Sequence, residues 1–136
     1  MVDAESVSVR LARLSQLLEE LEEIRAGGHA TYKSDFRTRL AAAHAIQLAV
    51  QVCIDVGAHL IAELGLEAPS DYRGIFDSLR SAGLEPQLAK RLGEAAGMRN
   101  ILVHGYLEVD DEAVWSALSR LDDLRQFAAF AQGQID

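Results

Sequence analysis

AIQLAVQVCIDVGAHLIAELGL, residues 45–66, is the stretch of sequence that decides the fold. Its apolar residues recur at intervals of three and four, which is the spacing of a helix face. One face carries Ala43, Ile46, Val50, Ile54 and Ile61, and another carries Ala45, Leu48, Val52 and Val56. A helix that is apolar on two faces lies centrally in a bundle. We therefore expect a central helix that starts at Ser34–Asp35, which can supply the N-cap, and ends at Leu64, before Gly65.

Four further helical segments surround this central one in the sequence. Each begins or ends at turn or capping residues, in chain order: Ala4 to Arg25, stopped by Gly27–Gly28; Ser70 to Gly83; Pro86 to the segment Arg99–Tyr106; and from Asp110 onward. Short connections favour antiparallel neighbours, and no convincing two-residue strand periodicity occurs. The sequence therefore predicts an all-α protein, a single domain over residues 1–136 folded as an antiparallel bundle of four to five helices.

Composition restricts the class of function. The 136 residues include 21 acidic and 13 basic side chains, a net charge of −8, so any nucleic acid must be held by a local basic patch. The N-terminus lacks the pattern of a signal peptide, and no uninterrupted apolar run approaches membrane-spanning length. Cys53, the single cysteine, lies in an apolar run and is interpreted as a buried small side chain. We expect a cytoplasmic protein with no metal site and no cofactor, since no metal-ligand or phosphate-loop motif occurs.

The helix that begins at Pro86 carries a charge where its apolar stripe should continue. The stripe steps by four and three residues through Leu88, Leu92, Ala95, Arg99, Leu102 and Tyr106. An arginine there is unfavourable unless it is paired or lies in a polar cleft; the alternative is that its long side chain reaches the surface. His104 follows five residues later, about 140° further round a regular helix, so the two side chains diverge. A helix end at Gly105, or a second copy across a dimer, would let them converge.

The segment RNILVHGY, Arg99–Tyr106, resembles the R-x4-H-x-Y motif of HEPN-domain toxins of the HepT type. The central helix and the segments PSDYRGIFDSLRSAGL, LAKRLGEAAGMRN and LEVDDEAVWSALSRLDDLRQFAAFA are similar to that family too, so the resemblance covers residues 40–131. It implies a HEPN-type helical bundle that forms a homodimer with two motifs facing one cleft. It also implies metal-independent RNA cleavage and a partner, a minimal nucleotidyltransferase antitoxin that transfers AMP from ATP onto the motif tyrosine, here Tyr106.

The residue types of this motif suit RNA cleavage without a metal. The 2′-hydroxyl of RNA can attack the adjacent phosphate if a base takes its proton and an acid protonates the leaving 5′-oxygen. His104 can do either, and the end of a helix favours its charged form. Arg99 can stabilise the extra charge on the phosphorane, and Asn100 can orient His104 or the phosphate. Tyr106 can position the substrate, and AMP on it would add bulk and negative charge that repel RNA.

Other interpretations remain open. The chain could be a non-catalytic partner that binds nucleotide or regulates a nucleotidyltransferase, which the acidic charge slightly favours, or a purely structural dimer, which leaves Arg99 unexplained. Tyr106 could simply pack between the last two long helices, since it continues the apolar stripe. A polar seam on the central helix either lines the catalytic cleft or is an ordinary polar face; it consists of His44, Gln47, Gln51, Asp55 and His59.

Overall fold

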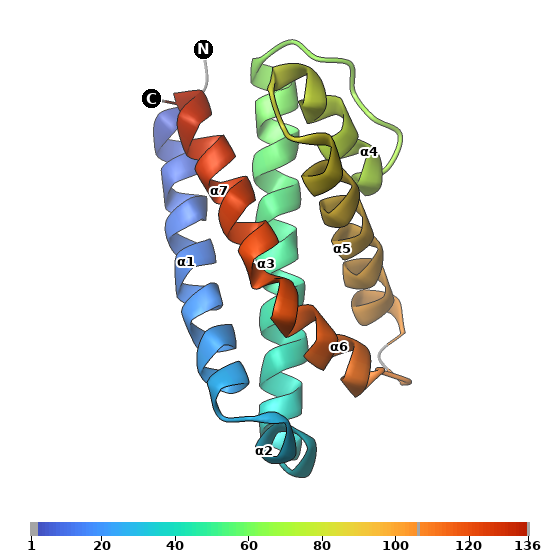
Figure 1. Ribbon diagram of the computed structural model, residues 1–136. Coiled ribbons are helices and arrows are strands. Elements are labelled where there is room, and N and C mark those ends of the chain that lie inside the picture. Colours follow the sequence, from blue (N-terminus) through green and yellow to red (C-terminus); the bar gives the residue numbers. More distant parts are fainter. Residues whose placement is uncertain (1–2, 106, 136) are drawn as a thin grey trace.

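The computed structural model describes residues 3–105 and 107–135, and all regular secondary structure in those ranges is helical (Figure 1). The elements are, in chain order, α1 (Ala4–Ala26), α2 (His29–Ser34), α3 (Phe36–Glu63), α4 (Tyr72–Ser78), the 3-10 helix η1 (Leu79–Ala82), α5 (Pro86–His104), α6 (Asp111–Ala117), the 3-10 helix η2 (Leu118–Arg120) and α7 (Leu121–Ile135). The prediction of an all-α bundle is confirmed.

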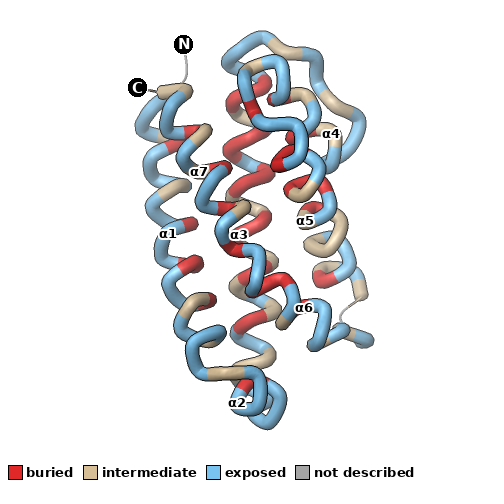
Figure 2. The backbone as a smooth tube through the Cα atoms, viewed as in Figure 1, coloured by how far each residue is buried: buried red, intermediate tan, exposed pale blue. Residues whose placement is uncertain are grey.

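Helix α3 is the centre of the bundle, as its two apolar faces predict. It packs against α1, α5 and α7, with α4 near one of its ends and α6 near the other (Figure 1). Buried positions follow the sides of the helices that face the interior (Figure 2). The largest fully buried side chains include Leu14, Leu21, Ile54, Leu60, Phe76 and Phe127. Of the second apolar face of α3, only Val56 is fully buried, because Leu48 and Val52 lie at the margin of the core.

The ends of the long helices follow local chemistry. The side chain of Asp35 caps α3 by accepting from the backbone N–H of Arg37. Pro86 is the first residue of α5, and Gly105 follows its last residue, as expected. The expected last helix is instead divided: α6 and α7 are separated by the 3-10 turn η2, which lets α6 pack on α3 while α7 also packs along α1 and α5.

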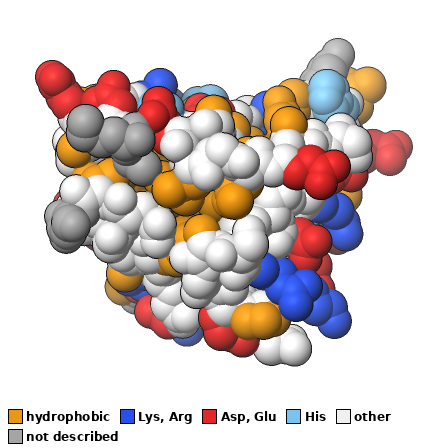
Figure 3. All heavy atoms as spheres, turned by 90° about the horizontal axis from the view of Figure 1, so that it is seen from above, with side chains coloured by type: hydrophobic (Ala, Val, Ile, Leu, Met, Phe, Trp, Pro, Cys, Tyr) orange, Lys and Arg blue, Asp and Glu red, His pale blue; other side chains and the backbone are white. Residues whose placement is uncertain are grey.

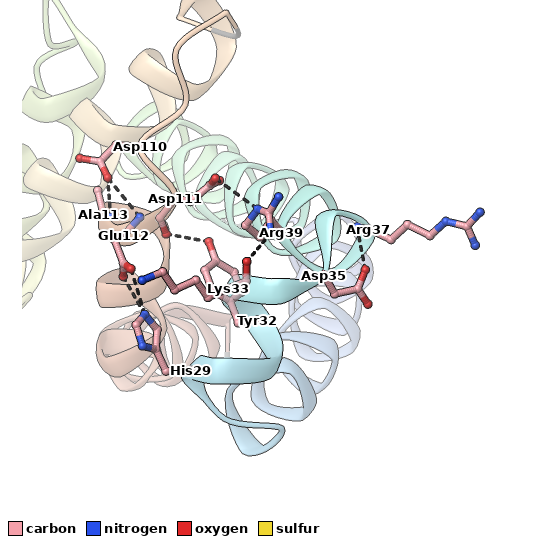
Figure 4. Close-up of polar contacts among 10 residues, drawn as sticks. All are labelled: His29, Tyr32, Lys33, Asp35, Arg37, Arg39, Asp110, Asp111, Glu112 and Ala113. Atoms are coloured by element: carbon pink, nitrogen blue, oxygen red, sulfur yellow. Dashed lines mark hydrogen bonds and ion pairs between the residues drawn. The ribbon is translucent and has the colours of Figure 1, made fainter.

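Helix α2 is not predicted by the sequence, and tertiary contacts explain why it forms. Tyr32 is 1% exposed and its hydroxyl donates to the backbone oxygen of Asp111 at 2.7 Å, while His29 Nε2 lies 2.8 Å from a carboxylate oxygen of Glu112 (Figure 4). The ring of Trp115 lies beside both aromatic rings, 5.0 Å from that of Tyr32. These contacts fix the start of α6, and with it one end of the connection from α5 to α6.

By length and composition alone, α3 could be mistaken for a membrane span. Its most apolar window of 18 residues has a mean hydropathy of 1.6, although polar side chains recur along the helix and keep each apolar run short. Half of that window is buried inside the bundle, as is usual for the core helix of a helical bundle.

Candidate active site

Arg99 is held against the body of the bundle. It lies in α5 and is half-buried, and the carbon of its guanidinium is 5.4 Å from the centre of the Tyr72 ring of α4. Its Nη1 donates to Asn100 Oδ1 at 2.8 Å, whereas its Nε is buried without a hydrogen-bond partner. The side chain therefore does not simply extend into solvent. Its free Nε–H is a donor in a water-poor position, where a phosphate oxygen would be a favourable acceptor.

His104 is the last residue of α5, and its side chain is exposed. The helix stays regular up to this point, where the N–H of Gly105 donates to the backbone oxygen of Ile101 at 2.7 Å. A regular helix keeps the side chains of Arg99 and His104 about 140° apart, as the spacing predicts. The structure therefore brings Arg99 and Asn100 together within one chain but does not bring His104 to them. Tyr106 lies outside the described residues, so its predicted place at the site stays a prediction.

Tyr72 is the site residue that sequence reasoning missed. It is the first residue of α4 and is 42% exposed, and Asp71 caps the helix by accepting from the N–H of Gly74 at 2.8 Å. An aromatic face beside a guanidinium stabilises the cation and restricts its movement. The signal in the sequence is only a tyrosine after a capping aspartate, and nothing in it points to a residue 27 positions further along the chain.

The polar seam of α3 is not a uniformly solvated face. His44 and Asp55 are exposed, whereas the other three members are half-buried. Gln51 Nε2 donates to Asp55 Oδ1 at 2.8 Å, but Gln51 Oε1 and His59 Nε2 are buried without a partner. No hydrogen bond or ion pair joins the seam to Arg99 or His104 within the described part of the chain. The structure therefore leaves both interpretations of the seam open.

A separate crevice of about 110 Å³ lies between α3, α5 and the C-terminal segment formed by α6, η2 and α7. Arg91 and Asp123 line it and form an ion pair at 3.0 Å, so the charge of Arg91 is already paired within the chain. No group of three or more His, Cys, Asp or Glu side chains that could hold a metal ion occurs in residues 3–105 and 107–135.

The proteins that this chain resembles agree in kind: the curated relatives are named nucleases, and the solved structure is that of a HEPN toxin. A curated protein named tRNA nuclease HepT, from Aphanizomenon flos-aquae, is 27% identical over 83% of this chain and 78% of its own. One named mRNA nuclease HepT, from Shewanella oneidensis, is 28% identical over 87% of this chain and 90% of its own. A solved structure of a tri-AMPylated Shewanella oneidensis HEPN toxin in complex with MNT antitoxin is 25% identical, has a TM-score of 0.85 and covers 98% of this chain and 99% of that chain.

The sequence model of the family described as Ribonuclease HepT-like matches residues 14–131, which extends the resemblance to most of α1. The matched range spans Tyr72 and the segment Arg99–Tyr106. The chain therefore belongs to the HepT-like ribonuclease family.

Proposed function

We propose that this protein is the toxin of a toxin–antitoxin pair: a cytoplasmic, single-domain, metal-independent endoribonuclease whose antitoxin transfers AMP onto Tyr106. The observation that carries the proposal is the state of Arg99, which is half-buried against Tyr72 with a buried and unpartnered Nε–H, in a chain of the HepT-like family. A structural arginine would have that donor satisfied. A buried donor that no group of the chain satisfies suits the oxygen of a phosphate substrate.

The chemistry needs only the RNA and this chain's side chains. The 2′-oxygen attacks phosphorus as its proton leaves, the bond from phosphorus to the 5′-oxygen breaks, and a proton goes to that oxygen, giving a 2′,3′-cyclic phosphate and a 5′-hydroxyl. His104 is accessible to exchange these protons with the substrate. Arg99 stabilises the phosphorane, and Asn100, which already accepts from Arg99, fixes the guanidinium.

The proposal requires a homodimer with the two motifs near the two-fold axis. Arg99 and His104 diverge on one helix, so a second copy is the simplest way to surround one phosphate with both residue types. Ile101 and Leu107, on either side of His104, are 63% and 85% exposed, which suits a surface that another chain covers. Light scattering should give twice the monomer mass at micromolar concentration. A monomer that cleaves RNA at full rate would contradict the shared cleft.

The central test is RNA cleavage by the His104→Ala variant. Loss of a proton-transfer group typically lowers the rate by about 10² to 10⁴-fold, and an exposed histidine can be removed without unfolding the domain. Arg37→Gln is the control, because Arg37 is exposed on α3 and its side chain makes no hydrogen bond or ion pair with any other described residue. Activity should persist in EDTA. Full cleavage by folded His104→Ala, or loss in EDTA that Mg²⁺ restores, would refute the mechanism; RNA binding without cleavage by the wild type would favour the non-catalytic alternative.

AMP transfer has its own test. Incubation with the cognate minimal nucleotidyltransferase and ATP, followed by peptide mass spectrometry, should place AMP on Tyr106. The support is the resemblance of RNILVHGY to the family motif and the AMP-modified relative that this chain resembles. Adducts on Tyr32 or Tyr72 instead would refute this part and leave the nuclease proposal standing.

A further inference from the structure

Arg73, the residue after Tyr72, lies flat on α5 over two glycines. A methyl group built on Gly97 would be 2.5 Å from Arg73 Nη2 and 3.3 Å from its Cζ and Nε. A methyl group on Gly93, one turn earlier, would only reach ordinary contact with the stem, 3.8 Å from Arg73 Cβ. Because neither residue has a side chain, Arg73 can lie close to the backbone of α5. We call this contact surface over Gly93 and Gly97 the groove, and the guanidinium of Arg73 lies at its Gly97 end.

This guanidinium has no partner of its own. Arg73 is exposed and makes no hydrogen bond or ion pair with any other described residue. The two carboxylates nearest to Arg73 in the sequence are engaged elsewhere: Asp71 caps α4, and Asp77 pairs with Arg80 at 3.1 Å. The groove therefore positions a charged fork whose donors are free, which is the form in which arginine binds phosphate.

The groove leads to the motif. Gly93, Gly97, Asn100 and His104 follow one another at steps of four, three and four, so they form one stripe along α5. On that stripe Asn100 lies about 4.5 Å and His104 about 10 Å beyond Gly97 along the axis. Helix α4 thus places its first residue against Arg99 and its second on the stripe that ends at His104.

We propose that Arg73 is a further RNA-binding residue, which holds a backbone phosphate next to the one that is cleaved. The inference rests on the proposed function. It supplies part of the local basic patch that a protein of net charge −8 needs in order to hold a polyanion. Arg73 is a binding residue and not a proton-transfer group, so it should affect affinity before it affects chemistry.

Gly97→Ala and Gly93→Ala test the geometry as a matched pair. Both add one methyl group to α5, but only the methyl at Gly97 displaces the guanidinium, and it does so by moving the far end of a flexible side chain, so both variants should fold. Arg73→Gln removes the charge directly, and Arg37→Gln removes a distant exposed one. The probe is a mixed-sequence single-stranded 2′-O-methyl RNA, which lacks the attacking hydroxyl. Its affinity for unmodified protein, in which no AMP phosphate competes, is measured by fluorescence anisotropy across a salt series.

Arg73→Gln and Gly97→Ala should each weaken binding about ten-fold at low salt, the size expected for one charge-assisted phosphate contact, and should lower the salt slope by about 0.7. Gly93→Ala and Arg37→Gln should change neither. Unchanged affinity and slope for Arg73→Gln would overturn this inference while leaving the His104-dependent cleavage intact. A wild type that binds no RNA would overturn the proposed function and this inference together.

Discussion

Gly57 is the position at which one added methyl group should do most harm to the fold. It is buried in α3 where α4 crosses, and a methyl group there would lie 2.6 Å from Ile75 Cγ2, 3.5 Å from Leu79 Cδ1 and 3.8 Å from Phe127 Cζ. The first distance is shorter than any real contact between two carbons. Glycine at this position is what allows α4 to lie so close to α3.

Two effects oppose each other in Gly57→Ala. Alanine is a better helix former than glycine by up to about 1 kcal/mol, and burying a methyl group contributes about 0.8 kcal/mol. Overpacking typically costs about 1–3 kcal/mol more than a fitted side chain, and here the obstacle is Ile75, which is 4% exposed and stiff because it is β-branched. Because Ile75 cannot move aside easily, we expect a cost at the upper end of that range, about 3 kcal/mol, against gains of about 1.8 kcal/mol together. The free energy of unfolding should then be lower by about 1 kcal/mol and the melting temperature by roughly 3–5 °C.

Urea denaturation followed by circular dichroism measures this effect. Gly133→Ala in α7 is the matched control, because nothing lies within 4 Å of its added methyl group and it should gain stability from helix propensity alone. Since Ile75 shares α4 with Tyr72 and Arg73, Gly57→Ala should also lower RNA cleavage at temperatures where it is fully folded. A Gly57→Ala variant as stable as Gly133→Ala would show that α4 does not approach α3 as closely as described.

Further expectations concern single side chains. Tyr72→Leu should lower kcat/KM about two- to five-fold, the equivalent of an exposed cation–π contact of about 0.5–1 kcal/mol, and Tyr72→Phe should restore it in the same single-turnover assay, because the ring alone faces Arg99. Burial raises the pKa of the Cys53 thiol from 9.0 to about 12, so the native protein should react with Ellman's reagent only after urea unfolds it. Burial, and then the nearby Asp111 carboxylate, raise the pKa of Tyr32 from 10.0 to about 12. Both groups are neutral when protonated, so the fold binds these protons more tightly than the unfolded chain does. The free energy of unfolding should therefore be constant below pH 9 and fall as the pH rises from 9 to 12, and in Cys53→Ala the fall should begin nearer pH 10. A flat profile of urea midpoints over that range would contradict these pKa directions.

The parts of the fold that could be predicted are those that local chemistry determines. The limits of α5 follow from Pro86 and Gly105, whose effects reach only their own helix turn. Helix α2 could not be predicted because its stability depends on Tyr32 reaching a backbone oxygen 79 residues away. The turn η2 carries no glycine or proline, and it exists because α6 and α7 pack against different helices.

The candidate site likewise has a part that local chemistry determines and a part that depends on tertiary packing. The divergence of Arg99 and His104 follows from their spacing on one helix, so the sequence predicts it. The contact of Arg99 with Tyr72, and the groove at Gly97, depend on where α4 lies against α5. Glycine in the middle of a helix destabilises it by about 1 kcal/mol relative to alanine, so Gly97 indicates that another group packs closely against α5. The sequence does not say which group that is.

The net charge of −8 is compatible with the proposed RNA substrate, because part of the negative charge lies far from the proposed RNA-binding stripe. The acidic run of α1, Glu19, Glu20, Glu22 and Glu23, lies on one side of α3, and α5 lies on the other (Figure 1). Seen from the end of the bundle, the visible Lys and Arg side chains gather mainly on one side, among a few acidic ones (Figure 3). Helices α1 and α5 are separated by two helix–helix spacings of about 8–10 Å each, and their sum exceeds the Debye length of about 8 Å at physiological salt. RNA bound as proposed along the stripe of α5 would therefore be screened from the α1 carboxylates but not from Arg73 and Arg99, and local charge would then control binding while net charge acts on the distant approach.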